Sequence, residues 1–219
     1  MLALAGASHV DHRLFTYDEA RTTNAPNEPL SILARWMATY PVNGHADLGR
    51  TGSVCPFVRQ STRLDLLRLA ICPAGPDDED EAFAIVRGSF RNLEGIPAPP
   101  GRERLRTIVI GFPNCANPEG LEMLGRVFKR HKYYTLVRFR MIAFFHAASD
   151  THGLWNPEFR PMRSPMPVLG ARYMIEQDAI FAAHYKLLLA PYLLRFGLAG
   201  VRRLAAYWRG VRNNPAVNT

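Results

Sequence analysis

Hydrophobic side chains recur along this chain with two different periods. Apolar positions three and four residues apart predict helices over 28–40, 82–95, 118–132, 178–189 and 195–212. Largely apolar or alternating runs predict strands over 63–72, 107–112, 135–145 and 168–175. Strands and helices alternate, and a long irregular span precedes the last strand. This order predicts an α+β fold: a single mixed sheet of about four to five strands with helices packed on it.

Residues that begin and end helices sharpen these boundaries. Pro29 suits the opening turn of the first helix, and Asn117 is a plausible N-cap of the helix that Pro118 begins. The acidic run 77–81 suits the N-terminus of the next helix, where the helix dipole favours negative charge. We expect Pro191 to bend or stop the helix that begins near Asp178.

The same patterns predict the organisation of the chain. Residues 1–26 show no clear period and are interpreted as an N-terminal arm. Residues 27–196 are interpreted as a single α+β domain, and 197–219 as a basic amphipathic C-terminal helix and tail. With 219 residues, 47% hydrophobic and 21% charged, the chain has the composition of a globular protein that can bury a core.

The net charge of +8 is concentrated in the C-terminal part, where residues 158–219 hold nine Lys or Arg against three acids. This bias suggests an anionic partner, and the alternative is a basic surface without a partner. An anionic membrane surface, contacted peripherally, and an acidic protein are the candidate partners, and we expect no nucleic acid. The last helix suits two uses, packing on the sheet or lying on a bilayer with Tyr207 and Trp208 as interfacial anchors.

The three cysteines, Cys55, Cys72 and Cys115, form no CxxC pair. The N-terminal residues lack the basic start and long apolar run of a signal peptide. We therefore predict a cytoplasmic protein with reduced thiols. No uninterrupted apolar run reaches the length of about 18 residues that spans a bilayer.

Candidate chemistry gathers first in the segment 44–57, GHADLGRTGSVCPF, which glycine and proline make a poor helix and a poor strand. Cys55 precedes a proline, as some haem-ligating cysteines do, and it is also a candidate nucleophile beside the cation Arg50. Asp47 could orient the His45 imidazole for general-base or metal chemistry. The alternatives are a buried thiol at Cys55 and a histidine that caps local backbone at His45.

A second cluster follows the strand predicted over 135–145. His146 comes directly after two phenylalanines, which would suit a flat hydrophobic cofactor or would simply be core. The proline-rich stretch after it reads as a rigid wall. Arg163 and Arg172 could grip a carboxylate or a haem propionate, or could pair with Asp178, Glu158 or Asp47.

Several common motifs are absent from the sequence. It has no Gly-x-Gly-x-x-Gly, no P-loop, no Gly-x-Ser-x-Gly, no His-Glu-x-x-His and no zinc-type Cys/His spacing. Most dinucleotide, nucleotide, hydrolase and zinc functions are therefore excluded.

Three motifs carry a resemblance to a known family: HxDLGRxGxVCPF at 45–57, NPxF at 156–159 and SPxPxLxxRxM at 164–174. With these motifs the chain resembles, over about 44–182, an uncharacterised bacterial domain family often encoded near natural-product genes. More distantly, the element order is similar to that of small haem-dependent N-oxygenases of amino acids. The first resemblance implies no activity, and the second implies haem chemistry on an amino-acid-like substrate.

The leading hypothesis is therefore a haem-dependent oxygenase that tailors a small amino-acid-like metabolite. His146 or Cys55 would be the axial ligand, Arg163 and Arg172 would anchor propionates or substrate, and Asp47 would orient a ligand. One alternative is cysteine-dependent acyl transfer, with Cys55 as nucleophile and His45 or His146 as base. The other is a non-catalytic binding module that docks through its basic C-terminal helix. In each enzyme hypothesis, Cys55 or His45 should line the same pocket as His146.

Overall fold

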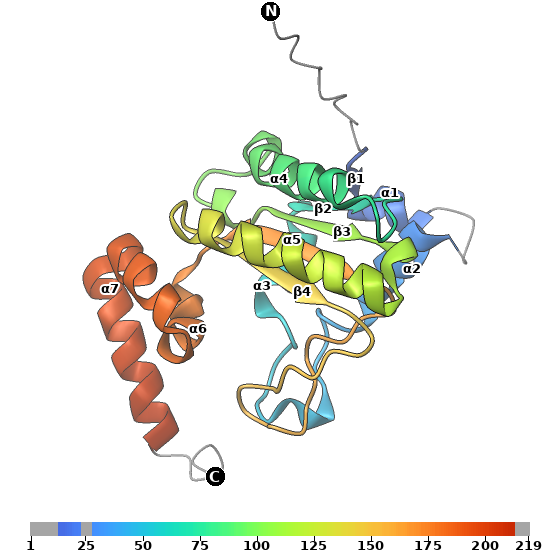
Figure 1. Ribbon diagram of the computed structural model, residues 1–219. Helices are drawn as coiled ribbons and strands as arrows, with labels where there is room; N and C mark the ends of the chain where they lie inside the picture. Colours follow the sequence, from blue (N-terminus) through green and yellow to red (C-terminus); the bar gives the residue numbers. More distant parts are fainter. Residues whose placement is uncertain (1–12, 23–27, 213–219) are drawn as a thin grey trace, which may run out of the picture.

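The computed structural model describes residues 13–22 and 28–212, and within them one sheet holds five strands in the order β1-β2-β3-β5-β4 (Figure 1). The strands are β1 (Phe15–Thr16), β2 (Leu67–Ile71), β3 (Thr107–Gly111), β4 (Arg140–Phe145) and β5 (Val168–Tyr173). β2 and β3 are parallel, and the other three neighbouring pairs are antiparallel. The predicted α+β fold with a single mixed sheet is confirmed.

Seven α-helices accompany the sheet in the described ranges. They are α1 (Tyr17–Thr22), α2 (Pro29–Thr39), α3 (Pro56–Arg63), α4 (Glu79–Gly95), α5 (Pro118–Leu136), α6 (Ala179–His184) and α7 (Lys186–Arg212). The predicted start signals are confirmed at three of them, and one is α4, whose first turn holds the acidic residues Glu79, Asp80 and Glu81. Pro29 occupies the first turn of α2, and the Asn117 side chain accepts a hydrogen bond from the Gly120 N–H at 3.0 Å.

Two predicted strands begin several residues later than expected. The run 63–72 begins as the end of α3, because Pro56 fits the first helical position and starts a helix that the sequence analysis missed. The run 135–145 begins inside α5, and the chain turns at Phe139, whose φ is 54°, before β4 starts. Short apolar runs fit a helix end and a strand equally well, so periodicity alone misplaces these boundaries.

The core lies on both faces of the sheet. α4 and α5 cover one face, where Leu169 and Ala171 of β5 join a cluster around Phe90 and Phe112. On the other face, α1 and α2 pack on β2, β3 and β5, with Leu33 and Met37 of α2 fully buried. Side chains of a strand alternate between the two faces, so parity along β4 and β5 decides which residues approach the candidate site.

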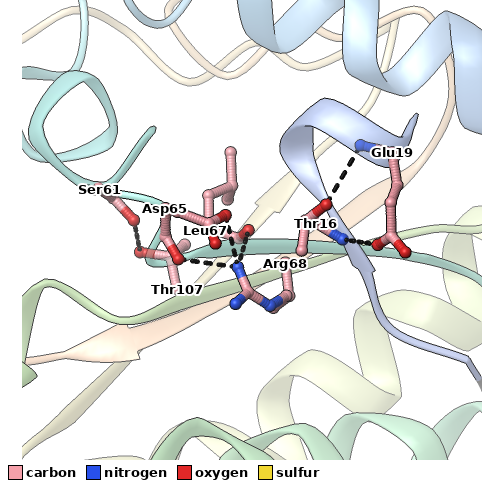
Figure 2. Close-up of polar contacts among 7 residues, drawn as sticks. All are labelled: Thr16, Glu19, Ser61, Asp65, Leu67, Arg68 and Thr107. Atoms are coloured by element: carbon pink, nitrogen blue, oxygen red, sulfur yellow. Dashed lines mark hydrogen bonds and ion pairs between the residues drawn. The ribbon is translucent and has the colours of Figure 1, made fainter. Parts of the chain in front are cut away.

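Short polar links attach the outer elements to the sheet (Figure 2). Thr16 and Glu19 cap the start of α1 reciprocally: the Thr16 N–H donates to Glu19 Oε2 at 2.7 Å, and the Glu19 N–H donates to Thr16 Oγ1 at 3.1 Å. The buried Ser61 hydroxyl of α3 donates to Thr107 Oγ1 of β3 at 3.2 Å. β1 and α1 thus connect part of the predicted arm to the sheet.

The C-terminal helices form a third apolar cluster beside the end of β5. Leu188 and Tyr192 of α7 are buried there, and the Tyr192 hydroxyl donates to the Glu176 carbonyl at 2.7 Å. Pro191 was expected to bend or stop the helix that begins near Asp178, but that helix, α6, already ends at His184, and Pro191 lies inside α7. The interruption comes at Gly197, whose φ of 50° and ψ of −130° are open to glycine and divide α7 into two helical halves.

No helix within the described ranges is both long enough and apolar enough to cross a bilayer. The thiols of Cys55, Cys72 and Cys115 are free. The cytoplasmic location stays a prediction.

A buried histidine links α4 and α5. His131 Nδ1 lies 2.9 Å from the Val127 carbonyl, so the neutral ring carries its proton on Nδ1, and Nε2 is buried with no hydrogen-bond partner in the described part of the chain. The ring lies 4.3 Å from that of Phe83. Burial lowers the pKa of His131, and the positive charges of Arg87 and Arg130 act in the same direction.

We expect His131→Leu to make folding stability less sensitive to acid. The unfolded chain binds a proton near pH 6.5 while the folded chain resists it, so the wild type loses stability as pH falls below about 6.5, at no more than about 1.4 kcal/mol per pH unit. The variant lacks this loss. Urea unfolding at pH 7.5, 6.5 and 5.5 measures both free energies of unfolding. If the free energies of unfolding of the wild type and the variant fall equally as pH is lowered, His131 has the same pKa in the folded and unfolded chains, and the prediction is wrong.

Candidate functional site

Two long loops meet below the sheet, as Figure 1 shows: the glycine-rich loop, residues 41–55, and the proline-rich loop, residues 146–167. The Asn156 amide donates to the Asp47 carbonyl at 2.8 Å, and the His45 and Phe159 rings lie 4.8 Å apart. The Tyr40 hydroxyl, at the end of α2, lies 3.4 Å from the Arg160 carbonyl. The two loops therefore form one structural unit.

Gly49 allows the closest approach of the two loops. Its φ of 74° is left-handed, and a Cβ built there would lie 2.9 Å from the backbone carbon and oxygen of Trp155. Both the backbone conformation and the contact require glycine.

Arg50 holds the glycine-rich loop together from within. Its guanidinium donates to the carbonyls of Thr51 at 3.0 Å, Ser53 at 2.9 Å and Val54 at 3.2 Å. From its place in the sequence, Arg50 is a candidate for the cation beside a reactive thiolate. In this geometry its donors satisfy backbone carbonyls, which is a structural role.

The two loops and the end of α2 enclose an open groove of about 530 Å³. Trp36, Tyr40 and Phe159 form aromatic walls, and the Trp36 ring packs edge-on against Phe145 of β4 with centroids 5.5 Å apart. The remaining lining residues are His45, Asp47, Ala147, Glu158, Arg160, Arg163, Ser164 and Pro165. Side chains of both charges thus lie beside aromatic rings.

His45 lines this groove with one ring nitrogen already engaged. The Asp47 N–H donates to His45 Nδ1 at 3.1 Å, whereas the Asp47 carboxylate oxygen Oδ2 is 3.7 Å from the same nitrogen. A nitrogen that accepts a hydrogen bond carries no proton, so the neutral ring holds its proton on Nε2. His45 therefore presents a hydrogen-bond donor, and the backbone of Asp47, rather than its carboxylate, orients the ring.

Arg163 brings a positive charge to the rim of the groove. Its Nε donates to the Ser149 carbonyl at 3.2 Å, which fixes the guanidinium, and its Nη2 lies 3.8 Å from an exposed Asp150 carboxylate. Such an exposed ion pair is weak and exchanges readily with another anion. Burial raises the pKa of the Tyr40 hydroxyl, and the positive charge of Arg163 partly opposes this shift.

His146 does not line the groove, although the adjacent Ala147 does. Its ring is tilted against that of Phe144, with centroids 5.0 Å apart, and Phe144 packs against Phe128 of α5. Phe145 points the opposite way, toward Trp36. Burial lowers the pKa of His146, and the negative charge of Asp150 opposes this shift. The structure thus brings His45 and the segment after His146 together, but not the two histidines in one pocket.

Cys55 and Arg172 lie elsewhere on the groove side of the sheet. Cys55 is the half-buried residue before α3, where its N–H donates to the Pro41 carbonyl at 2.8 Å. The Arg172 guanidinium binds both oxygens of Asp178, at 2.8 and 2.6 Å, and lies over the Phe57 ring. The geometry gives Arg172 the ion pair that the sequence analysis named as its alternative role, and neither residue lines the groove.

The aromatic side chains that line the groove were not predicted as site residues from the sequence. Trp36 and Tyr40 fall on the apolar stripe that predicts the helix over 28–40, and that stripe favours burial of both. Leu33 and Met37 are indeed buried, but Trp36 and Tyr40 remain half-buried where α2 passes the loops. Both side chains are amphipathic and lie shortly before the glycine-rich loop in the sequence, and these two features could have indicated that they line a site.

No group of three or more His, Cys, Asp or Glu side chains in the described ranges is arranged to hold a metal ion. Comparison with curated proteins and with solved structures finds no significant match. A family model, the domain of unknown function DUF6875, matches residues 30–206, which is more than half of the chain. The resemblance to an uncharacterised domain family is confirmed, and the chain belongs to the DUF6875 family.

Proposed function

We propose that this protein binds a small aromatic amino-acid-like metabolite in the groove between the two loops. The observation that carries the proposal is the composition of the groove, in which aromatic walls adjoin both a guanidinium and carboxylates. An aromatic amino acid presents three groups that complement these: a flat ring, a carboxylate and an ammonium group.

The groups of the groove suit these features one by one. Trp36, Tyr40 and Phe159 offer ring surface for stacking or edge contacts. Arg163 can exchange its exposed partner Asp150 for the carboxylate of the ligand through a charge-assisted hydrogen bond. The negatively charged Asp47 carboxylate also lines the groove and suits the ammonium group of the ligand.

Haem chemistry receives less support from this geometry. An axial ligand needs a free nitrogen or sulfur directed into a cavity that accommodates the macrocycle, and neither Cys55 nor His146 lines the groove. His45 does, but a neutral ring that accepts a hydrogen bond at Nδ1 keeps a proton on Nε2. The candidate ligand atoms of Cys55, His146 and His45 are therefore not arranged to bind a haem iron. The oxygenase stays a prediction that a Soret band, in protein expressed with a haem precursor, would support.

Cysteine-dependent acyl transfer receives no specific support either. The nucleophile would be Cys55, outside the groove, and Arg50 already donates to three backbone carbonyls. We therefore propose ligand recognition and assign no covalent step.

Titration calorimetry with L-phenylalanine, 3-phenylpropionate and phenethylamine tests the proposal. We expect the two carboxylates to bind at least tenfold more tightly than phenethylamine, because a hydrogen bond between charged groups contributes about 1.5–3 kcal/mol. Arg163→Gln should remove most of this preference.

Arg104→Gln is the control, because Arg104 is an exposed arginine in another part of the chain. It should bind all three compounds like the wild type. Equal loss in both variants, or no heat of binding for any of the compounds with wild-type protein, would contradict the proposal.

A further inference from the structure

The C-terminal segment, residues 179–219, is basic and holds no acid of its own, and Arg203 pairs with Glu176 just before it. From residue 179 to residue 219 there is no Asp or Glu, and the last acid before it is Asp178. The cations of this segment are Lys186, Arg195, Arg202, Arg203, Arg209 and Arg212. Any partner that covers α7 therefore meets a field of one sign.

The same helix exposes large apolar side chains. Leu194 is 79% exposed, Leu198 77% and Leu187 62%, and Trp208 remains 46% exposed. Between α6 and α7 an apolar groove of about 410 Å³ opens to the surface. It is lined by Ala182, Ala183, Leu189, Leu193, Val201, Leu204, Ala205 and Trp208. Exposed apolar side chains and an apolar groove on the same helix indicate an interaction site.

Apolar and basic positions in the second half of α7 form adjoining stripes. Leu198, Val201 and Trp208 recur at intervals of three and seven residues and so lie on one side of the helix. Arg202 and Arg209 each follow one residue later and border that side. This arrangement places cations along the edge of an apolar face.

The rest of the protein holds this surface in a fixed position. The Tyr207 hydroxyl lies 2.6 Å from His184 Nε2 of α6, and its ring meets Trp155 of the proline-rich loop edge-on at 5.9 Å. In Figure 1, α7 extends at one side of the molecule, away from α4 and α5. A partner can therefore reach its outer face without unfolding the domain.

We propose that α7 docks the protein on a bilayer that contains anionic phospholipid. Anionic headgroups complement the arginines, and acyl chains accept the exposed leucines without a matching pocket. A second copy of this chain would bring the same cations together, and like charges disfavour that contact. Trp208, which is 46% exposed, suits the headgroup level, where aromatic side chains with a polar tip are enriched.

Co-sedimentation of the full chain with vesicles tests this proposal. We expect pelleting with phosphatidylcholine vesicles containing 30% phosphatidylserine at about 50 mM salt, little with phosphatidylcholine alone, and release at about 500 mM salt. Arg202→Glu/Arg209→Glu should weaken binding at least about 30-fold, because each removed cation contributes about a factor of five or more near an anionic surface. Leu194→Ser/Leu198→Ser should weaken it about tenfold or more.

Matched variants on other elements separate this surface from general charge and hydrophobicity. Arg91→Glu/Arg104→Glu makes the same change in net charge, and Tyr133→Ser/Val137→Ser removes two exposed apolar side chains from the end of α5. Both should bind vesicles like the wild type, and circular dichroism should show every variant folded. Failure of the wild type to pellet at low salt would overturn the proposal. Equal weakening by the control variants would also overturn it. So would a protein that does not bind vesicles but forms a dimer in sedimentation velocity, if Leu194→Ser/Leu198→Ser abolishes that dimer.

Discussion

Replacing Asp178 by alanine is expected to lower the free energy of unfolding by about 3–5 kcal/mol, because it leaves a largely buried guanidinium without its counter-charge. Asp178 binds Arg172 through both oxygens, and one of these oxygens also accepts the Ile175 N–H at 2.9 Å. Only 3% of the Asp178 side chain is exposed. The substitution thus removes the ion pair and one backbone hydrogen bond together.

Two comparisons separate this cost from that of removing any acid nearby. Glu176→Gln, two residues away, disrupts an ion pair with Arg203 whose side chains are both exposed, and should cost less than about 1 kcal/mol. The double variant Arg172→Met/Asp178→Ala removes both charges and should recover part of the stability lost in Asp178→Ala. Urea unfolding measures all of these. Equal stability of Asp178→Ala and Glu176→Gln would show that the pair contributes little.

The fold follows from periodicity wherever an element is long or fully buried. The apolar run 107–112 can only be an interior strand, and the helix over Pro29–Thr39 combines a clear stripe with a proline at its start. α3 is different, because it has only eight residues and follows a segment rich in glycine. Its position depends on contacts such as that between Ser61 and Thr107, which no local pattern encodes.

Side-chain chemistry predicted some of the residues of the candidate site, but not how they are arranged in space. His45, Asp47 and Arg163 were identified as polar residues on irregular segments, and all three line the groove. Cys55 and His146 were identified in the same way and do not line it. For His146 a signal existed, because residues two apart on a strand share a face, and Phe144 belongs to the face that α5 covers. Which loop meets which is a tertiary property that the sequence pattern does not contain.

The contact between the two loops should depend on the absence of a side chain at Gly49. We expect Gly49→Ala to lower the free energy of unfolding by more than about 2 kcal/mol, because a left-handed L-residue costs about 1–2 kcal/mol and its Cβ would meet the Trp155 backbone at 2.9 Å. Moving Trp155 shifts the proline-rich loop that carries Phe159, so the binding of L-phenylalanine in the groove should weaken as well.

Gly101→Ala is the matched control for this substitution. Gly101 has a φ of 76°, close to the 74° of Gly49, but a Cβ there meets nothing within 4 Å. It should show the backbone cost alone and bind L-phenylalanine like the wild type. Gly52→Ala, in the glycine-rich loop itself, has a φ of 99° and approaches only the end of the flexible Arg50 side chain, at 3.5 Å, so it should fall between the other two. If Gly49→Ala is no less stable than Gly101→Ala in urea unfolding, the close approach of the two loops does not hold them together.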